Sequence, residues 1–290
     1  MTTGTTLRES VRGVPASPVR TVVSGYHGYL DRGVPPALHR GLPSPYLTVI
    51  FTLHEPLQVA QHVDHRRPPG EYDSLVGGLH TSPALVTHDG AQSGIQLQLS
   101  PLGARALLGM PAGELAGLDV AGSAVLGRAA SRIGEVLRDA ATWPERFAAL
   151  DRQLLAHGAQ AGEAARQPAP EVVEAWRCLL RTGGTVPISR LAAHVGWSDR
   201  QLARRFRTEI GLTPKAAARV IRFDRARRLL QRGATDSLAR LAADCGYYDQ
   251  PHLVREFNAF AGCPPTRWYA EEFGNIQAVP QSDEPRSGDD

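Results

Sequence analysis

The side chains best suited to bind another molecule are arginines, and they concentrate in one part of this 290-residue chain. Residues 188–232 hold 12 basic and 3 acidic side chains, and Lys215 is the only lysine among the 32 basic residues of the chain. Arginine offers planar, bidentate hydrogen bonding to phosphate and to guanine. The whole chain has a net charge of only +3, and the residues outside 185–272 are mildly acidic. This distribution predicts a polyanionic partner for one half of the chain.

A sequence repeat with an offset of about 50 residues runs through and beyond this basic block. Residues 191–199, LAAHVGWSD, align with residues 241–249, LAADCGYYD. Further along, a Leu-x-x-x-Phe pair and a Gly-x-x-Pro motif recur in the same order, at 202–206 and 211–214 in the first copy and at 253–257 and 262–265 in the second. The second copy carries one extra residue before its second helix.

Each copy has the features of a helix, a tight turn and a second helix. Gly196 stands where the first helix must end in a left-handed conformation, and Ser198 or Asp199 supplies an N-cap oxygen for the next helix. Leu202 and Phe206 lie four residues apart and face the core. One such helix pair could be mere scaffolding, but two copies with every feature in order favour two helix-turn-helix units. The exposed polar sets are Arg200, Gln201, Arg204, Arg205 and Arg207 in the first copy and Gln250, His252 and Arg255 in the second.

Residues 171–272 resemble the AraC/XylS family of bacterial transcription regulators. The resemblance includes a linking helix at 216–232, where RVIRFDRARRLL at 219–230 is similar to the family's R…R…A…LL segment. It implies sequence-specific DNA binding, with two recognition helices in successive major grooves on one face of the DNA. The base-facing residues that it implies are Arg200, Gln201 and Arg204 in the first groove and Gln250, His252 and Arg255 in the second.

Other polar residues of this region are candidates for phosphate contacts, which add affinity and salt dependence but little specificity. Asp224 and Glu209 are alternative partners for some of them on the helix surface. Pro251 departs from a position that is usually polar in the family, so it removes one base contact. The phosphate candidates are Ser198, Arg205, Arg207, Lys215, Arg222 and Arg225.

The first half of the chain has the pattern of a β-rich domain followed by helices. Short alternating or β-branched segments predict strands at 46–53, 56–60, 77–80, 84–87 and 94–99, a spacing typical of a sandwich or barrel. A helical period then predicts helices at 102–108, 124–140 and 143–157. No element is predicted before residue 45. In the family resemblance this half looks like a cupin-type effector or dimerisation domain, and residues 94–115 are similar to a subgroup of such domains.

The sequence therefore predicts an α+β protein of two domains. The first is a β-rich, cupin- or jelly-roll-like sensing or dimerisation domain with trailing helices at 1–157, and the second is an all-α DNA-binding domain at 171–272 with two helix-turn-helix units joined by a linking helix. Residues 158–170, poor in large apolar side chains and ending in prolines, are the expected linker. The polar residues 273–290 are the expected disordered tail.

Neither a metal nor a cofactor is expected. His62 and His65 could share a metal with Asp64 or Glu71, but residues 64–70 have the composition of a polar loop, and no phosphate loop or dinucleotide fingerprint occurs. Three scattered cysteines, at 178, 245 and 263, predict buried thiols, with a redox pair of Cys245 and Cys263 as the alternative. The lack of a long apolar stretch and of a secretory signal predicts a cytoplasmic protein without a membrane partner.

The leading functional hypothesis is a regulator that binds double-stranded promoter DNA under the control of its first domain. A small-molecule effector, RNA polymerase and a second copy in a homodimer are further candidate partners. One alternative is an enzyme fused to the DNA-binding unit, as in repair methyltransferases, but Cys178 lacks the Pro-Cys-His setting of such enzymes and no catalytic residue is expected. The other is a binding module that responds through partner proteins alone.

Overall fold

The structure is a computed structural model, and it describes residues 6–160, 167–233 and 237–273. Helix α5 (Trp143–Gln160) continues past residue 158, where the linker was expected to begin, and α6 (Pro170–Arg181) starts at the expected end of that linker. Residues 161–166 of the expected linker and 274–290 of the expected tail lie outside the described residues.

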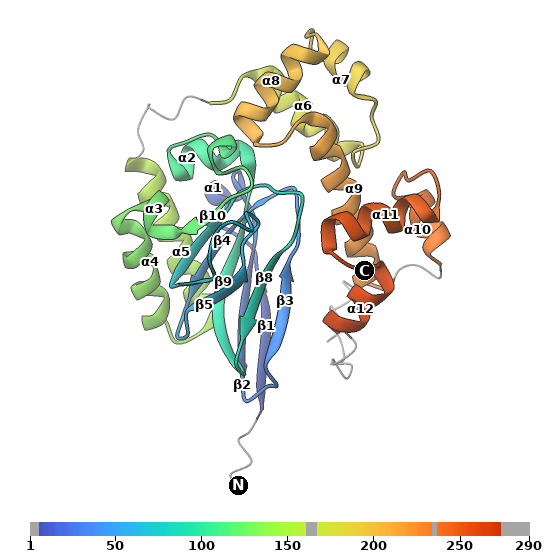
Figure 1. Cartoon of the computed structure of the whole chain (residues 1–290). Coiled ribbons are helices and arrows are strands. Elements are labelled where there is room, and N and C mark those ends of the chain that lie inside the picture. Colours follow the sequence, from blue (N-terminus) through green and yellow to red (C-terminus); the bar gives the residue numbers. More distant parts are fainter. Residues whose placement is uncertain (1–5, 161–166, 234–236, 274–290) are drawn as a thin grey trace, which may run out of the picture.

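Two antiparallel sheets form the first half of the chain (Figure 1). The larger sheet has the strand order β1 (Leu7–Gly13), β2 (Val23–Arg32), β9 (Ala91–Leu99), β4 (Leu47–Thr52), β7 (Ser74–Gly77) and β10 (Asp119–Ala121). The smaller sheet has the order β3 (Ala37–Gly41), β8 (Ala84–His88), β5 (Leu57–Gln61) and β6 (Gly70–Tyr72). The predicted β-rich domain with two layers of strands is confirmed.

The strand predictions hold best in the middle of the domain. β4, β5, β8 and β9 overlap the predicted segments, whereas β1, β2 and β3 lie in residues 1–44, where no element was predicted. The predicted strand at 77–80 is wrong, because β7 ends at Gly77. Gly78 instead donates its backbone N–H to the carbonyl of Leu118, and a Cβ atom on Gly78 would lie 1.7 Å from the carbonyl oxygen of Leu115. This close approach removes the segment from the sheet.

The helices that follow the strands cover one face of the larger sheet (Figure 1). Besides α1 (Ser17–Arg20) and α5, they are η1 (Pro101–Gly103), α2 (Ala104–Leu108), η2 (Ala112–Leu115), α3 (Gly122–Leu126) and α4 (Arg128–Asp139). The single helix predicted at 124–140 is wrong, since Gly127, with a φ of +55°, separates α3 from α4. Trp143 of α5 packs against the backbone of Gly28 in β2, where any Cβ atom would lie 2.4 Å from the indole ring.

The second half is all helical, as predicted. Its elements after α6 are α7 (Ile188–His194), α8 (Asp199–Ile210), α9 (Pro214–Gln231), α10 (Leu238–Asp244), α11 (Gln250–Ala261) and α12 (Pro265–Phe273). α7 with α8 and α10 with α11 form the two helix-turn-helix units, and α9 is the linking helix. Gly196 and Gly246 end the first helix of each unit at φ values of +72° and +74°, which confirms the turn deduced from the repeat.

The two halves are in direct contact. The C-terminal end of α8 lies on η2, where a Cβ atom on Gly113 would be 2.1 Å from the carbonyl oxygen of Thr208. Arg105 of α2 forms a bidentate ion pair with Glu209 of α8, both bonds being 2.9 Å long. One continuous cluster of buried apolar side chains extends from the sheets into the second half. The position of the first helix-turn-helix unit is therefore fixed in part by the first half of the chain.

Three histidines of the first half are held in environments that favour the neutral imidazole. Burial lowers the pKa of His27, His80 and His88 from the ordinary value of 6.5, and nearby Arg12 and His39 add to the effect at His27 and His88 respectively. Between the lowered pKa values and about 6.5, the unfolded chain binds more protons than the folded chain. The contribution of these three histidines to the free energy of unfolding is therefore fully present above about pH 6.5, and it is lost as the pH falls below that value.

We expect the midpoint of thermal unfolding to be constant between about pH 8 and 7 and to decrease between about pH 6.5 and 5.5. Differential scanning calorimetry of the full chain measures it. His65→Ala, which changes an exposed histidine, should leave this profile unchanged. A midpoint that does not depend on pH down to about 5.5 would contradict the account.

Candidate nucleic-acid interface

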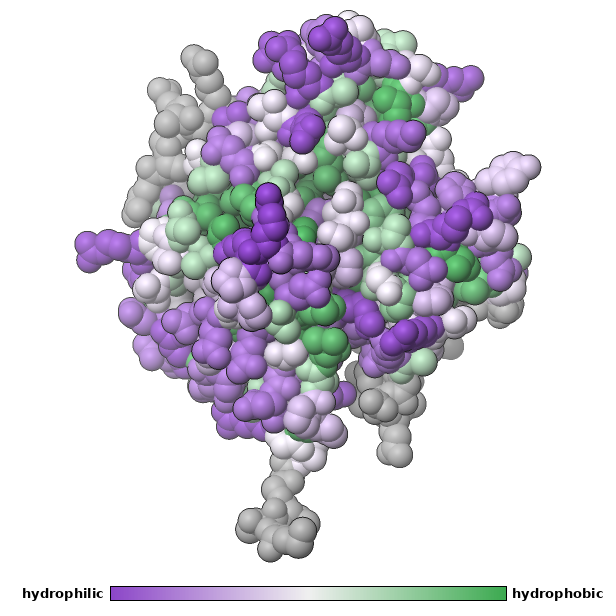
Figure 2. All heavy atoms as spheres, viewed as in Figure 1, coloured by the Kyte–Doolittle hydropathy of each residue, from purple (hydrophilic) through white to green (hydrophobic). Residues whose placement is uncertain are grey.

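The helix α8 has one buried face and one charged face. Leu202, Phe206 and Ile210 recur every four residues and are fully buried. The Ser198 hydroxyl caps the helix by accepting the backbone N–H of Gln201 at 3.3 Å. The polar side chains that the sequence repeat placed on the other face are all exposed: Arg200, Gln201, Arg204, Arg205 and Arg207. Hydrophilic residues accordingly gather over α7 and α8 at the top of Figure 2. The sequence repeat thus predicted the two faces of this helix correctly.

The helix α11 repeats this arrangement with less charge. Leu253 and Phe257 are buried, and the carboxylate of Asp249 accepts the backbone N–H of His252 at 2.7 Å as the N-cap. Gln250 and Arg255 are exposed, whereas the imidazole of His252 is half-buried.

The His252 ring is oriented by its surroundings. Its Nδ1 accepts the backbone N–H of Tyr248 at 3.3 Å, and its edge meets the ring of Tyr247 with 5.3 Å between centroids. In the neutral imidazole the proton is therefore on Nε2, which leaves that nitrogen as a hydrogen-bond donor.

Two exposed side chains of the second unit were missed by the sequence reasoning. Tyr248 is 93% exposed immediately before the N-cap of α11, and Asn258 is exposed one turn after Arg255. In the repeat Tyr248 aligns with Ser198, which had been assigned to phosphate contacts. That alignment was a signal that could have identified it.

The candidates for phosphate contacts differ in how their side chains are engaged. Ser198, Arg205, Arg207, Lys215 and Arg225 are exposed, whereas Arg222 donates to the carbonyl oxygen of Gly184 at 2.7 Å and lies over the ring of Tyr247. The two acidic residues suggested as alternative partners form ion pairs with other arginines. Glu209 pairs with Arg105, and Asp224 pairs with Arg227 and Arg228.

A buried carboxylate joins the second helix-turn-helix unit to the linking helix. Glu256 of α11 is 8% exposed and accepts from Arg219 of α9 at 2.5 Å, with Arg222 at 3.8 Å. Beside it a hollow of about 730 Å³ opens between the first turns of α9 and α11 and the loop before α7. Four basic side chains line this hollow: Lys215, Arg219, Arg222 and His252. The exposed charge of the two units therefore continues across the groove between them.

The histidines of the first half do not form a metal site among the described residues, where no cluster of three metal-ligating side chains occurs. Nδ1 of buried His62 is hydrogen-bonded to the carboxylate of Asp119, and Asp64 pairs with Arg66. The cysteines are free, and burial raises the pKa of the Cys245 thiol to about 11.

The comparisons with known proteins agree with this geometry. Residues 191–271 match the model of a helix-turn-helix domain. The solved structure of ToxT from Vibrio cholerae O395 superposes with a TM-score of 0.51 at 10% identity and covers 86% of this chain and 98% of ToxT. The chain therefore carries a helix-turn-helix DNA-binding domain at residues 191–271, within a fold similar to that of ToxT.

Two further solved structures are similar to this chain. Wild-type ToxT from Vibrio cholerae strain SCE256, bound to an unsaturated fatty acid, has a TM-score of 0.51 at 10% identity over 87% of this chain and 97% of its own. An AraC-type regulator from Chromobacterium violaceum is 26% identical over 37% of this chain and 96% of its own, with a TM-score of 0.34. No curated protein sequence matches the chain. No helix within the described residues is long and apolar enough to cross a membrane.

We expect Glu256→Ala to lower the free energy of unfolding by about 1–3 kcal/mol, because it leaves Arg219 and Arg222 without their shared carboxylate. Chemical denaturation of the full chain measures the change. Asp244→Ala, which removes the exposed partner of Arg240 at 3.9 Å, is the matched control and should cost less than about 0.5 kcal/mol. Equal effects of the two substitutions would show that Glu256 does not hold α11 against α9.

Proposed function

We propose that this protein is a transcription regulator, which recognises promoter DNA by placing α8 and α11 in successive major grooves on one face of the double helix. The observation that supports it best is the repetition of one arrangement in a single helical body: each helix has a capped N-terminus, a buried Leu and Phe face, and an exposed polar face. Successive major grooves are separated by about 34 Å, one turn of B-DNA. One chain would then read two short motifs about 10 base pairs apart.

The base contacts would come from the exposed faces of the two helices. Arginine pairs with guanine and glutamine with adenine through two hydrogen bonds each, worth roughly 1–3 kcal/mol of discrimination per pair. His252 would act as a donor through Nε2, because its Nδ1 is occupied by the backbone of Tyr248. We assign base contacts to Arg200, Gln201 and Arg204 of α8 and to Gln250, His252 and Arg255 of α11.

The phosphate contacts would surround these base contacts. The exposed side chains of Ser198, Arg205, Arg207, Lys215 and Arg225 are free to reach the DNA backbone. Arg222 is already bonded to Gly184 within the fold, so its substitution would affect stability as well as affinity. We assign less binding energy to the second unit, whose recognition helix carries one arginine and has Pro251 in its first turn.

The first half of the chain would control this binding. A solved ToxT structure holds an unsaturated fatty acid, and we propose that this half also binds a small-molecule effector. RNA polymerase and a second copy of the chain are further partners that we propose for a promoter-bound regulator. We place its action in the cytoplasm, where bacterial promoters are, and propose that it acts by binding and not by catalysis.

The first prediction of this proposal concerns Arg204. Replacement by alanine should weaken binding to the preferred DNA sequence by about tenfold or more, and weaken binding to unrelated DNA much less, because a base contact contributes to specificity. Fluorescence anisotropy at fixed salt measures both affinities. Arg177→Ala is the matched control, since Arg177 is an exposed arginine of α6 outside both units. Equal losses on both DNAs would mean that Arg204 contacts only phosphate.

A further inference from the structure

A cavity lined by both polar and apolar side chains opens at one end of the two sheets. Its volume is about 200 Å³, enough for a molecule of a few heavy atoms. The wall combines the ends of β2, β4, β5, β8 and β9 with the turns that follow them. Thr52, His88 and Ser93 line it as buried polar residues. The hydroxyl of Tyr29 also faces this cavity, and no hydrogen-bond partner for it occurs within residues 6–160, 167–233 and 237–273.

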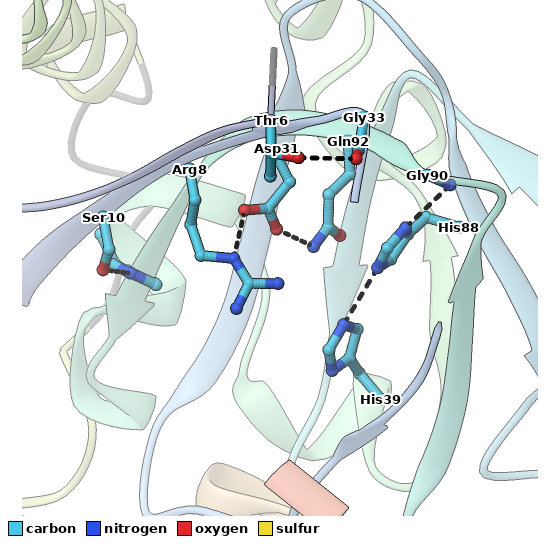
Figure 3. Close-up of polar contacts among 10 residues, drawn as sticks. Thr6, Arg8, Ser10, Asp31, Gly33, His39, His88, Gly90 and Gln92 are labelled. Atoms are coloured by element: carbon cyan, nitrogen blue, oxygen red, sulfur yellow. Dashed lines mark hydrogen bonds and ion pairs between the residues drawn. The ribbon is translucent and has the colours of Figure 1, made fainter. Parts of the chain in front are cut away.

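The charge of the wall is negative. Glu55 and Asp89 line the cavity, and neither forms an ion pair with any residue that the structure describes. Glu55 accepts only the hydroxyl of Ser93, at 3.3 Å. No lysine or arginine lines the cavity. The nearest arginine in the hydrogen-bond network, Arg8, is already paired with Asp31 at 3.0 Å, and Asp31 in turn accepts from the wall residue Gln92 at 2.8 Å (Figure 3).

Such a cavity favours one class of ligand. Two uncompensated carboxylates lower the free energy of a bound cation and raise that of a bound carboxylate. The hydroxyl of Tyr29 and the buried polar side chains of Thr52, His88 and Ser93 offer hydrogen bonds to a ligand, which favours polar groups over an alkyl chain beside them. A fatty acid, which has an anionic head and a long apolar tail, fits neither property.

One wall residue, His88, belongs to a hydrogen-bond chain that leaves the first half of the protein. Figure 3 shows the part of it from Gly90 through His88 to His39. Nδ1 of His88 accepts the backbone N–H of Gly90 at 3.2 Å, so the proton of the neutral ring is on Nε2. That N–H points to Nε2 of His39 at 3.2 Å, which places the proton of His39 on Nδ1. Nδ1 of His39 lies 3.4 Å from the carboxylate of Glu272 in α12. Each N–H donor in this hydrogen-bond series therefore faces an acceptor, and all the hydrogen bonds are donated in the direction from Gly90 to Glu272.

The contact between His39 and Glu272 also holds α12 against the smaller sheet. Arg40 of β3, next to His39, donates its backbone N–H to Glu272 at 3.3 Å and pairs with Glu271 at 2.6 Å. α12 follows α11 directly along the chain, through Gly262, which lies against Pro83 of the first half. A change in this contact therefore acts on the second recognition helix.

We propose that the cavity binds a small organic cation with hydrogen-bonding groups, and that the chain Gly90–His88–His39–Glu272 couples its occupancy to the second helix-turn-helix unit. This inference rests on the proposed role of the first half as an effector domain and names its ligand class and its route to the DNA-binding half. A cation held by Asp89 fixes the turn that carries Gly90. It thereby holds His88 in the orientation that donates to His39, and strengthens the contact of β3 with α12.

The ligand class is tested by titrating the full chain, in amine-free buffer, with three molecules of similar size and different charge. Ethanolamine should bind in the millimolar range, ethylene glycol about tenfold more weakly, and glycolate not measurably, as observed by isothermal titration calorimetry. Glu55→Gln keeps an acceptor for Ser93 and should reduce the preference for ethanolamine over ethylene glycol, whereas Glu55→Gln combined with Asp89→Asn should remove it. Binding of glycolate, equal binding of all three, or no binding of ethanolamine would overturn the assignment.

The coupling is tested by hydrogen–deuterium exchange on the same protein. Ethanolamine should slow exchange of the backbone amides of β3 and α12 by about fivefold or more. His39→Ala should abolish this protection while ethanolamine still binds, and His65→Ala, an exposed histidine outside the chain, should leave it intact. Protection of α12 that persists in His39→Ala, or binding without protection in the unmodified protein, would overturn the coupling. Neither readout uses DNA, so both are independent of the proposed DNA recognition.

Discussion

The linking helix α9 fixes the positions of both recognition helices, α8 and α11, relative to each other. Eight of its residues are buried, because it lies between the two helix-turn-helix units and packs against both. Phe223 meets the rings of Phe257 and Phe260 with 5.0 and 5.1 Å between centroids, so α11 is held by aromatic packing as well as by the Glu256 ion pair. A helix that is buried on several sides cannot rotate without breaking these contacts. The spacing of α8 and α11 is therefore a property of one rigid element.

The first half of the chain adds a second constraint. It contacts the second half at two separate places, through the Gly113–Thr208 approach with the Arg105–Glu209 pair at α8 and through the His39 and Arg40 contacts at α12. Glycine is needed at the first place because no Cβ atom fits. The second place is polar and half-buried, so it contributes less to stability and is more easily changed. This difference is the physical reason to expect control of the second unit.

Local signals in the sequence were sufficient for the helical half. Gly196, the cap at Ser198 and the spacing of Leu202 and Phe206 determine a helix-turn-helix unit without reference to distant residues, and the repeat doubles that evidence. The base and phosphate contacts stay predictions, because the faces of α8 and α11 show which side chains are exposed and not what they bind.

The first half shows where such reasoning fails. β2 contains Gly25 and Gly28, which weaken the strand pattern, and Gly28 is required only because Trp143, more than 100 residues away in sequence, packs on it. The break at Gly127 and the removal of Gly78 from the sheet likewise depend on a backbone conformation or a distant carbonyl. The hydrogen-bond chain from His88 to Glu272 joins strands and a helix from both ends of the protein. Long-range contacts of this kind cannot be predicted from a local sequence pattern.

The central claim is that one chain reads two DNA motifs with two helices held one turn of DNA apart. Selection of bound sequences from a random double-stranded DNA library by the full chain tests it most directly, since site, spacing and symmetry emerge together. The account predicts enriched sites with two different short motifs whose centres are about 10 base pairs apart, the stronger one read by α8. No enriched sequence, or a single motif with no second element at that spacing, would contradict it.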